Sequence, residues 1–384
     1  MTLATPRILI VSPTLLEYVG GTETVVLQLA RRLAPHCTLT ILTGTAGRRA
    51  LPASIDLPVE RVVTLPFAGR DTLTNRLLRR VLRLNPFVVE SRSFFRSLAR
   101  QGFDFRGFDA ILTFYERDAW LLVRRHPDLK ARALHLLPGV SKRRILRDVG
   151  EHNVVFLGYR APARAERKWG LRIPALPLGV DDCFFPPGPR SVPSTRRLVF
   201  VGRLDGSKHV DWLVDLFAGS ELHARGYTLD VIGDGPLEPA LRSAHGGTPG
   251  VRLLGRMTPA QVAEHLHDTH LVLHPTALES FGLTVLEAMA AGVPVITHAL
   301  PSIRAWAEDH PVYAAHLERG AWLQAIARFE DPAVWRAASA RNMAFARAFG
   351  WQPIADRVMA MLRERAAHPP VEARLGTPTG TGGR

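Results

Sequence analysis

The sequence predicts an α/β protein of two doubly wound domains, each with a parallel sheet covered by helices on both faces. Three observations carry this prediction. Short apolar runs alternate with amphipathic helical segments along nearly the whole chain of 384 residues. Ten such runs are more than one sheet normally holds, since sheets commonly have about 4–6 strands. A segment with four prolines and no periodicity, residues 183–197, interrupts the alternation near the middle of the chain.

The predicted strands are short, rich in Val, Ile and Leu, and bounded by turn residues, as buried parallel strands are. They span residues 7–11, 39–43, 110–115, 133–137, 153–157, 198–202, 228–233, 251–255, 271–275 and 293–297. Helices are predicted between them, for example over residues 23–33 and 212–222, because apolar side chains recur there at helical spacing.

The interruption divides the chain into an N-terminal domain, residues 1–182, a linker, residues 183–197, and a C-terminal domain, residues 198–350. A final helix is expected over residues 351–367. The remaining tail, residues 368–384, is rich in Pro, Gly and Thr and is expected to be disordered.

Composition and charge narrow the class of protein. With 46% hydrophobic residues and two cysteines, the chain is neither intrinsically disordered nor a disulfide scaffold. No run reaches the ~18 apolar residues of a membrane span, and the start lacks the pattern of a signal peptide, so we expect a cytoplasmic protein. The 49 Lys and Arg against 35 Asp and Glu give a net charge of +14, which indicates an anionic partner or reflects only a GC-rich genome.

The densest chemical signal is residues 277–296, ALESFGLTVLEAMAAGVPVI. A turn with Glu279 precedes a predicted helix that carries Glu287. Free backbone N–H groups from Gly282 to Thr284 would form an anion site at the start of that helix. The two carboxylates would accept hydrogen bonds from sugar hydroxyls; alternatively, both only complement the helix dipole.

Two further turns follow strands at the same predicted sheet edge. Residues 198–208, LVFVGRLDGSK, place Arg203 and Lys208 five residues apart after a strand, which suits a pyrophosphate. Ordinary surface charges are the alternative. Residues 229–236, LDVIGDGP, give a weaker signal, because they lack the third glycine of a dinucleotide fingerprint.

Taken together and in this order, these motifs resemble glycosyltransferase family 4, retaining enzymes of the GT-B fold, in which two Rossmann-like domains face each other across a cleft. The resemblance is strong over residues 175–355 and weaker over 1–175, where residues 19–23, VGGTE, resemble the N-terminal glycine loop. The motifs that carry it are Gly202-Arg203-Leu204 with Lys208, Gly233-Asp234-Gly235-Pro236, Leu254-Gly255, and Glu279 with Glu287.

The resemblance implies transfer of a sugar from a nucleotide-diphosphate sugar to a glycan, lipid-linked or small-molecule acceptor, without a metal or other cofactor. Arg203 and Lys208 would neutralise the diphosphate, Glu279 would contact the sugar and Glu287 the ribose. The other implied donor contacts are Gly20, Gly21, Gly202, Gly233, Arg256, Met257, Phe281, Gly282, Leu283 and Thr284. The chain contains no Asp-x-Asp motif, which agrees with a metal-independent enzyme. The last helix would cross back to the N-terminal domain.

Two positions depart from the family pattern. His209 stands where a glycine often follows the lysine, and residues 300–304, LPSIR, replace a glycine-rich stretch and a glutamate. The contacts on that side of the donor, and the donor preference, are therefore expected to differ, and Arg304 would add a cation there.

The acceptor side carries fewer signals. His135 is expected at the end of a strand, where the family often places a histidine facing the sugar, although a lone histidine there is often structural. Glu116 and Asp118 follow another strand and would either contact the acceptor or remain in solvent. The histidines within residues 265–274 share no common face, so no metal site is expected.

Residues 70–100 form the main basic region, with eight arginines against two acids. Apolar side chains recur there at helical spacing, a composition typical of an interfacial helix on anionic lipid. The candidate membrane contacts are Arg76, Arg79, Arg80 and Arg83. A core-packed helix with solvated arginines is the alternative, and nucleic acid is not an expected partner.

The competing interpretation of the whole chain is a non-catalytic protein of the same fold that binds a nucleotide sugar or anionic lipid. The presence of Arg203, Lys208, Glu279 and Glu287 argues against a loss of catalysis.

Overall fold

The computed structural model describes residues 5–17, 21–46, 59–69, 72 and 86–367. Contacts within the chain divide it into two compact units, which are described separately. Unit 1 comprises Met1–Leu157, Ala161–Leu176 and Gln352–Arg384, and unit 2 comprises Gly158–Arg160 and Pro177–Trp351.

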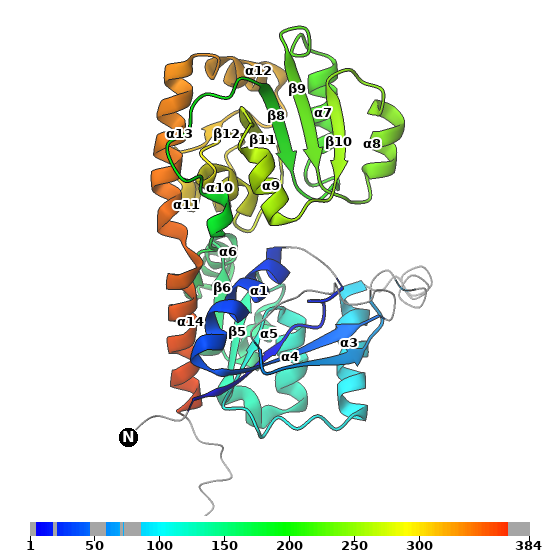
Figure 1. Ribbon diagram of the computed structural model, residues 1–384. Helices are drawn as coiled ribbons and strands as arrows, with labels where there is room; N and C mark the ends of the chain where they lie inside the picture. Colours follow the sequence, from blue (N-terminus) through cyan, green and yellow to red (C-terminus); the bar gives the residue numbers. More distant parts are fainter. Residues whose placement is uncertain (1–4, 18–20, 47–58, 70–71, 73–85, 368–384) are drawn as a thin grey trace, which may run out of the picture. The chain divides into compact units, whose positions relative to one another are not determined.

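Unit 1 contains, among the described residues, a seven-stranded sheet in the order β3-β2-β1-β4-β5-β6-β7, and every pairing in it is parallel (Figure 1). The strands are β1 (Arg7–Val11), β2 (Thr38–Thr45), β3 (Arg61–Pro66), β4 (Ala110–Thr113), β5 (Ala133–Leu137), β6 (Val154–Leu157) and β7 (Ala175–Leu176). The strand order reverses between β1 and β4. Such a switch point is where open α/β sheets bind ligands, beyond the carboxyl ends of the strands.

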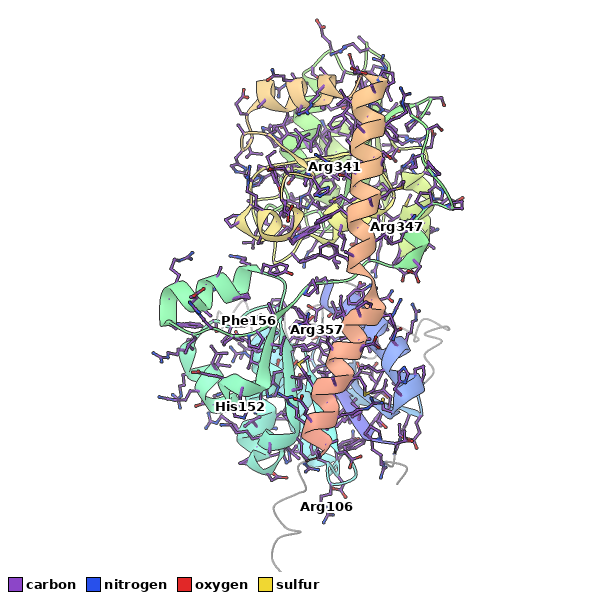
Figure 2. The ribbon with its side chains drawn as sticks, turned by 90° about the vertical axis from the view of Figure 1, so that its left-hand side faces the viewer. Arg106, His152, Phe156, Arg341, Arg347 and Arg357 are labelled. Atoms are coloured by element: carbon purple, nitrogen blue, oxygen red, sulfur yellow. The ribbon has the colours of Figure 1, made fainter. Side chains whose placement is uncertain are left out.

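The helices of unit 1 cover this sheet. They are α1 (Gly21–Leu33), α3 (Pro86–Arg100), α4 (Glu116–Arg125), α5 (Arg143–Val149) and, each after its first residue, α6 (Arg160–Trp169) and α14 (Trp351–Ala366). In Figure 2, α14 can be found by its residue Arg357, and His152 of unit 1 is also labelled. Arg365 of α14 donates hydrogen bonds to the carbonyls of Ala133, at 3.0 Å, and His152, at 3.1 Å. The last described helix is thereby attached to the first unit.

Unit 2 repeats the arrangement with a parallel sheet in the order β10-β9-β8-β11-β12-β13. Its strands are β8 (Arg196–Val201), β9 (Tyr227–Ile232), β10 (Val251–Gly255), β11 (Leu271–His274), β12 (Val295–Thr297) and β13 (Val312–Tyr313). Its helices are α7 (Val210–Ala218), α8 (Glu238–His245), α9 (Pro259–Leu266), α10 (Leu283–Ala290), α11 (Pro301–Ala307), α12 (Arg319–Arg328) and α13 (Pro332–Ala346). The switch point of this sheet lies between β8 and β11.

The predicted fold class is confirmed, and all ten predicted strands are present with small shifts at their ends. Three further strands were not predicted, and each lies at an edge of its sheet. An edge strand buries less surface, so its apolar pattern is weak. In β3, for example, Val62 is 44% exposed, and β7 and β13 have two residues each.

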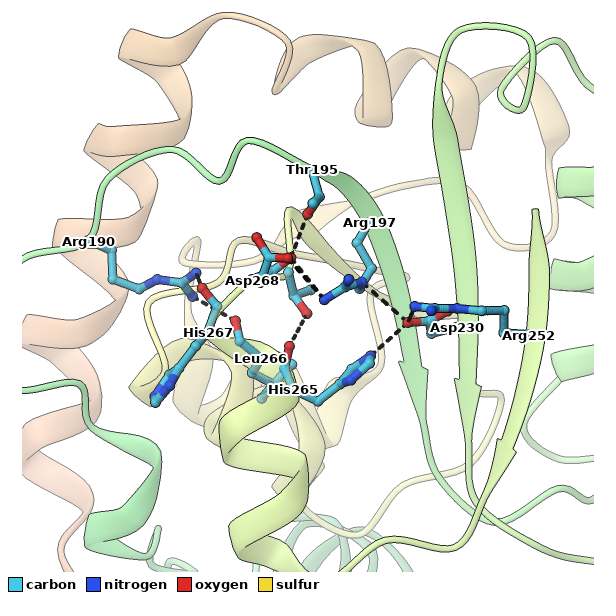
Figure 3. Close-up of polar contacts among 10 residues, drawn as sticks. Arg190, Thr195, Arg197, Asp230, Arg252, His265, Leu266, His267 and Asp268 are labelled. Carbon is cyan, nitrogen blue, oxygen red and sulfur yellow. Dashed lines mark hydrogen bonds and ion pairs between the residues drawn. The ribbon is translucent and has the colours of Figure 1, made fainter.

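The proline-rich segment predicted as a linker is attached to unit 2 (Figure 3). Arg190 donates hydrogen bonds to the carbonyls of Leu266 and Ala291, both at 2.9 Å. Thr195 donates to the carbonyl of Asp268 at 2.7 Å. These bonds hold the segment against the end of α9, the turn before β11 and the end of α10.

A buried charge network lies beside this segment (Figure 3). The carboxylate of Asp230, in β9, is fully buried and accepts two hydrogen bonds from Arg252, at 2.6 and 2.5 Å, and one contact from His265 at 2.7 Å. Arg197 lies 3.4 Å from it. Burial alone would raise the pKa of Asp230, but the hydrogen bonds from His265 and Arg252 outweigh burial and lower it. His265 therefore has a structural partner.

In the part of the chain that the structure describes, no helix is both long and apolar enough to cross a membrane.

Candidate functional site

Two loops of unit 2 meet at its switch point. Lys208 lies in the loop after β8, and Glu279 lies in the loop after β11. The ammonium group of Lys208 donates a hydrogen bond to Oε1 of Glu279. The two side chains are only 18% and 19% exposed. An ion pair between residues 71 positions apart therefore joins the two loops.

Glu279 is held in its ionised form. Burial opposes its ionisation, but the hydrogen bond from His274 and the charge of Lys208 outweigh burial and lower the pKa of Glu279 to about 2. Nε2 of His274 lies 3.5 Å from Oε1 of Glu279, and its Nδ1 lies 3.3 Å from the hydroxyl of Thr297. At neutral pH, Glu279 is thus a hydrogen-bond acceptor and cannot serve as a proton donor.

Backbone contacts fix the relative position of the two loops. The amide of Ala277 donates to the carbonyl of Ser207 at 2.8 Å, and the hydroxyl of Thr276 donates to the same carbonyl at 3.2 Å. The amide of Lys208 donates to the carbonyl of Asp205 at 3.0 Å. The Lys208–Glu279 pair is therefore built on a rigid frame, as a preorganised site requires.

Arg203 lies in the same loop as Lys208 but in a different environment. Its side chain is 58% exposed, and its Nε lies 3.5 Å from the carboxylate of Asp205. A long exposed guanidinium can change partner at low cost, because exposed ion pairs are weak. Arg203 is thus available to a ligand, whereas Lys208 is already oriented.

Gly233 lies where there is no room for a side chain between two of these loops. Its φ is 140°, and a Cβ atom there would lie 1.9 Å from the carbonyl oxygen of Gly202. The amide of Gly202 in turn donates to the carbonyl of Ile232 at 3.0 Å. Glycine at position 233 lets the loops after β8 and β9 approach each other closely.

The start of α10 is fixed by an aromatic stack. The rings of Phe281 and Trp306 stack with their centres 4.5 Å apart, and the indole N–H of Trp306 donates to the carbonyl of Phe281 at 2.8 Å. Gly282 follows with a φ of 93° and forms the N-cap. The hydroxyl of Thr284 donates to the carbonyl of Val201, in β8, at 3.3 Å.

This arrangement places the first turn of α10 beside the end of β8. The first helical hydrogen bond there runs from the amide of Val285 to the carbonyl of Gly282, at 3.0 Å. The amides of Gly282, Leu283 and Thr284 precede it, as in any helix start, and such amides suit a negatively charged ligand.

Glu287 lies one turn further along α10. Burial, followed by the negative charge of Asp181, raises the pKa of Glu287 to about 7. Asp181 is itself placed by a hydrogen bond that its carboxylate accepts from the amide of Cys183 at 3.2 Å. A carboxyl group with such a pKa can either accept or donate a hydrogen bond near neutrality.

The remaining predicted donor contacts lie in three places. Arg256 is exposed and Met257 half-buried, directly after β10 and before Thr258, the N-cap of α9. Gly21 is the first residue of α1 in unit 1. Gly20 and the arginines at 76, 79, 80 and 83 lie outside the described residues.

The switch point of unit 1 also has a hydrogen-bonded carboxylate. Glu23, in the first turn of α1, accepts hydrogen bonds from the hydroxyl of Thr14 at 2.8 Å and from that of Tyr115 at 2.6 Å. These residues come from the loops after β1 and β4. The network therefore fixes the start of α1, which Gly21 begins.

Of the predicted acceptor contacts, Glu116 and Asp118 are not free acids in solvent. The carboxylate of Glu116 accepts a hydrogen bond from the amide of Ser141 at 2.5 Å. Asp118 is buried, and burial raises its pKa to about 7 against the effect of a hydrogen bond from Ser91. Asp118 is thus packed inside unit 1, and Glu116 is engaged by the backbone at Ser141.

The prediction that His135 ends a strand is wrong. It is the central residue of β5 and fully buried, with Nδ1 2.8 Å from the hydroxyl of Thr113. Burial, followed by the charges of Arg365 and Lys130, lowers the pKa of His135 to about 3. In this structure, the neutral imidazole of His135 is enclosed in the sheet interior and is not accessible to a sugar.

The amino-acid sequence is similar to those of known glycosyltransferases. Residues 195–330 match the family described as glycosyl transferases group 1. The D-inositol 3-phosphate glycosyltransferase of Kineococcus radiotolerans is 27% identical, with 90% of each chain covered. The GDP-mannose-dependent alpha-(1-6)-phosphatidylinositol dimannoside mannosyltransferase of Mycobacterium tuberculosis is 28% identical, covering 78% of this chain and 83% of the relative.

Solved structures share the fold. Sucrose-phosphate synthase from Thermosynechococcus elongatus has a TM-score of 0.72 at 20% identity, covering 94% of this chain and 99% of that one. Anabaena HepE, solved with UDP and glucose, has a TM-score of 0.71 at 15% identity and covers 94% and 100%. WaaG, a glycosyltransferase involved in lipopolysaccharide biosynthesis, has a TM-score of 0.66 at 16% identity and covers 92% and 99%. The predicted GT-B fold is confirmed.

Proposed function

We propose that this chain, a glycosyltransferase with the GT-B fold, moves a sugar from a nucleoside-diphosphate sugar to an acceptor hydroxyl with retention of configuration. The observation that carries the proposal is the ion pair between Lys208 and Glu279 at the switch point of unit 2. It sets a cation for the leaving diphosphate beside a carboxylate for the sugar. An ammonium has three N–H donors, so Lys208 can bind a phosphate oxygen while it holds Glu279.

In the proposed reaction, the bond between the anomeric carbon and the diphosphate breaks, and the diphosphate leaves with the electron pair. Lys208 and Arg203 stabilise the charge that develops on it, together with the first amides of α10. The acceptor oxygen then bonds to the anomeric carbon on the face that the diphosphate leaves, and its proton passes to an oxygen of the departing diphosphate. Glu279, ionised by its surroundings, favours the positive charge that develops on the sugar ring.

The relatives support the donor class and suggest the acceptor. The names of those reported above specify transfer to D-inositol 3-phosphate and, from GDP-mannose, to a phosphatidylinositol dimannoside. We infer a hydroxyl-rich acceptor, either small and soluble or lipid-linked, of the kind used to build the cell envelope. We further propose that the enzyme works without a metal and in the cytoplasm.

A ligand panel tests this proposal. We expect one of UDP, GDP, ADP or TDP, with its sugars, to raise the melting temperature, because a ligand that binds only the folded protein stabilises it. The matching nucleotide sugar should then be hydrolysed slowly without acceptor, measured as released sugar. Binding with neither hydrolysis nor transfer to any hydroxyl acceptor would instead favour the non-catalytic interpretation.

Glu287 gives a prediction about affinity and stability. We propose that it binds the ribose, so Glu287→Gln should weaken binding of the free diphosphate by about 10- to 150-fold, since a charged hydrogen bond is worth roughly 1.5–3 kcal/mol. The folded pKa of about 7 exceeds the usual value of 4.5, so the ligand-free fold loses stability as pH rises through this window. The variant should therefore melt higher than the wild type at pH 8 but not at pH 4.5.

Calorimetry of binding and of unfolding measures both effects. Glu264→Gln, an exposed change on α9, is the control and should alter neither. An unchanged diphosphate affinity in Glu287→Gln would remove Glu287 from the ribose site.

We also propose that the basic region binds an anionic membrane. In its described part, α3 presents Phe87, 47% exposed, together with the exposed Arg92 and Arg96. Replacing Arg76, Arg79, Arg80 and Arg83 by Gln should abolish flotation with acidic vesicles, because each contributes about 1 kcal/mol. Salt at 1 M should act like the mutation, since the Debye length falls to about 3 Å. Wild-type protein that fails to float with acidic vesicles at low salt would rule out this surface.

A further inference from the structure

Three histidines from separate loops lie together at the carboxyl edge of the sheet in unit 2. His209 follows Lys208 in the loop after β8, His298 follows β12, and His316 follows β13. The rings of His298 and His316 have centres 4.3 Å apart, and those of His209 and His316 are 5.5 Å apart. We call these three residues the histidine cluster.

The backbone at His209 is strained to place its ring there. Its φ is 50°, in the left-handed region that glycine adopts freely and other residues rarely enter. This is the position at which the sequence departs from the glycine of the family pattern. Strain of this kind persists where the surroundings enforce it and often marks a functional site.

The cluster also contains an unsatisfied polar atom. His298 is 8% exposed, and its Nδ1 has no hydrogen-bond partner among the residues that the structure describes. A buried polar atom without a partner costs free energy unless a ligand or water supplies the bond. A ligand that accepts hydrogen bonds would satisfy it.

The charges that surround the cluster favour an anion. Lys208 precedes His209, and His274, at the end of β11, contacts Glu279. Glu279 is the carboxylate of this group, and it is already paired with both. The nearest acids along the chain are Asp211, exposed in the first turn of α7 after His209, and Glu318, whose carboxylate accepts hydrogen bonds from the first amides of α12.

Protonation of His298 is suppressed without a ligand. Burial, followed by the charges of His316, His274 and His209, lowers the pKa of His298 to about 4. An anion would reverse the balance, because it favours the charged imidazole. A metal ion fits less well: within the described ranges, no group of three His, Cys, Asp or Glu side chains is placed to hold one.

We propose that His209, His298 and His316 form a subsite for an oxyanion of the donor, and that His298 takes up a proton from water when it binds. The oxyanion is either a carboxylate on the transferred sugar, as in a hexuronate, or an oxygen of the diphosphate. This inference rests on the proposed function, since it deepens the donor site around Lys208 and Glu279.

The test compares a nucleoside diphosphate, its neutral sugar and its hexuronate. UDP, UDP-glucose and UDP-glucuronate, and likewise GDP, GDP-mannose and GDP-mannuronate, are titrated into the full chain at pH 6 and pH 8. Calorimetry in two buffers of different ionisation heat counts the protons taken up. Glu287 and the terminal phosphate of the free diphosphates also titrate in this range. The quantity compared is therefore the difference between wild type and variant in the number of protons taken up.

The variants are His209→Gly, His298→Gln and His316→Gln, with His267→Gln as the matched control. His267 is exposed and precedes β11, at the opposite edge of the sheet. His209→Gly should fold at least as well as the wild type, because glycine adopts this φ without strain. A lost anion effect in that variant cannot then be attributed to misfolding.

We expect the ligand with the recognised oxyanion to bind about 10-fold more tightly for each pH unit lowered and proton taken up. The cluster variants should reduce this gain, and His267→Gln should keep it. A gain confined to the hexuronates identifies the sugar carboxylate, and an equal gain for neutral sugars identifies the diphosphate. Normal nucleotide binding with the same pH response in every variant would overturn the subsite alone. Failure of every nucleotide to bind would overturn the proposed function with it.

Discussion

Lys208→Ala should lower the turnover number by roughly 100-fold or more, the cost of losing one charge-stabilising donor at a developing anion. The change removes the cation that the structure holds against Glu279, so the leaving diphosphate meets an uncompensated carboxylate. Turnover is therefore expected to fall more than donor affinity. Steady-state kinetics with the donor found in the ligand panel measure both.

Two further variants make the result interpretable. Lys168→Ala removes an exposed lysine on α6 and should leave turnover unchanged. Arg203→Ala should change turnover in the same direction as Lys208→Ala, because the two cations are proposed to share the diphosphate. A Lys208→Ala enzyme with near-normal turnover and an intact melting curve would exclude Lys208 from the mechanism.

The second large effect concerns stability. Asp230→Asn should destabilise unit 2 toward the lower end of the ~3–5 kcal/mol typical of a broken buried ion pair. Arg252 is 49% exposed and can return to water, which moderates the loss, but His265 and Arg197 remain largely buried beside an amide. Urea unfolding at pH 7 measures the difference.

The pH dependence of this effect has a definite sign. Because the folded pKa of Asp230 is lowered, its contribution is complete above the unfolded value of ~3.9 and is lost as pH falls through the folded pKa. The variant should therefore differ from the wild type at pH 7 and converge with it in strong acid. Asp268→Asn, which affects a carboxylate 49% exposed, is the control and should cost less than about 1 kcal/mol. Equal stability of Asp230→Asn and wild type at pH 7 would contradict this account.

Most of the fold could be predicted from sequence because parallel strands buried on both faces are unbroken apolar runs. The strand Arg7–Val11 shows this, with four of its five residues buried. Strand β3 could not be found in the same way, because five of its six positions are exposed or half-buried and only Leu65 is buried. The attachment of residues 183–197 was also missed, since it depends on bonds from Arg190 to carbonyls about 75 and 100 positions away.

The candidate site was predicted in its parts but not in its pairing. Sequence spacing grouped Lys208 with Arg203, whereas the structure pairs Lys208 with Glu279 and sets Arg203 beside Asp205. The end of the strand was wrongly placed at His135, because an apolar run does not show at which residue the strand ends or which of its side chains are buried. The histidine cluster was missed because its members come from three loops; the shared signal was that each follows a strand of one sheet.

The attachment of α14 to unit 1 determines the order in which the two units can fold during synthesis. Val358 and Leu362 of this helix are buried, and they belong to the unit that begins at the N-terminus. About 175 residues of unit 2 separate them from the rest of unit 1. A ribosome adds about 5–20 residues per second, so roughly 10–35 seconds pass between the two parts. The surface of unit 1 that α14 covers therefore stays exposed until unit 2 has been synthesised. Unit 2 is the first of the two units whose residues are all available to complete its fold.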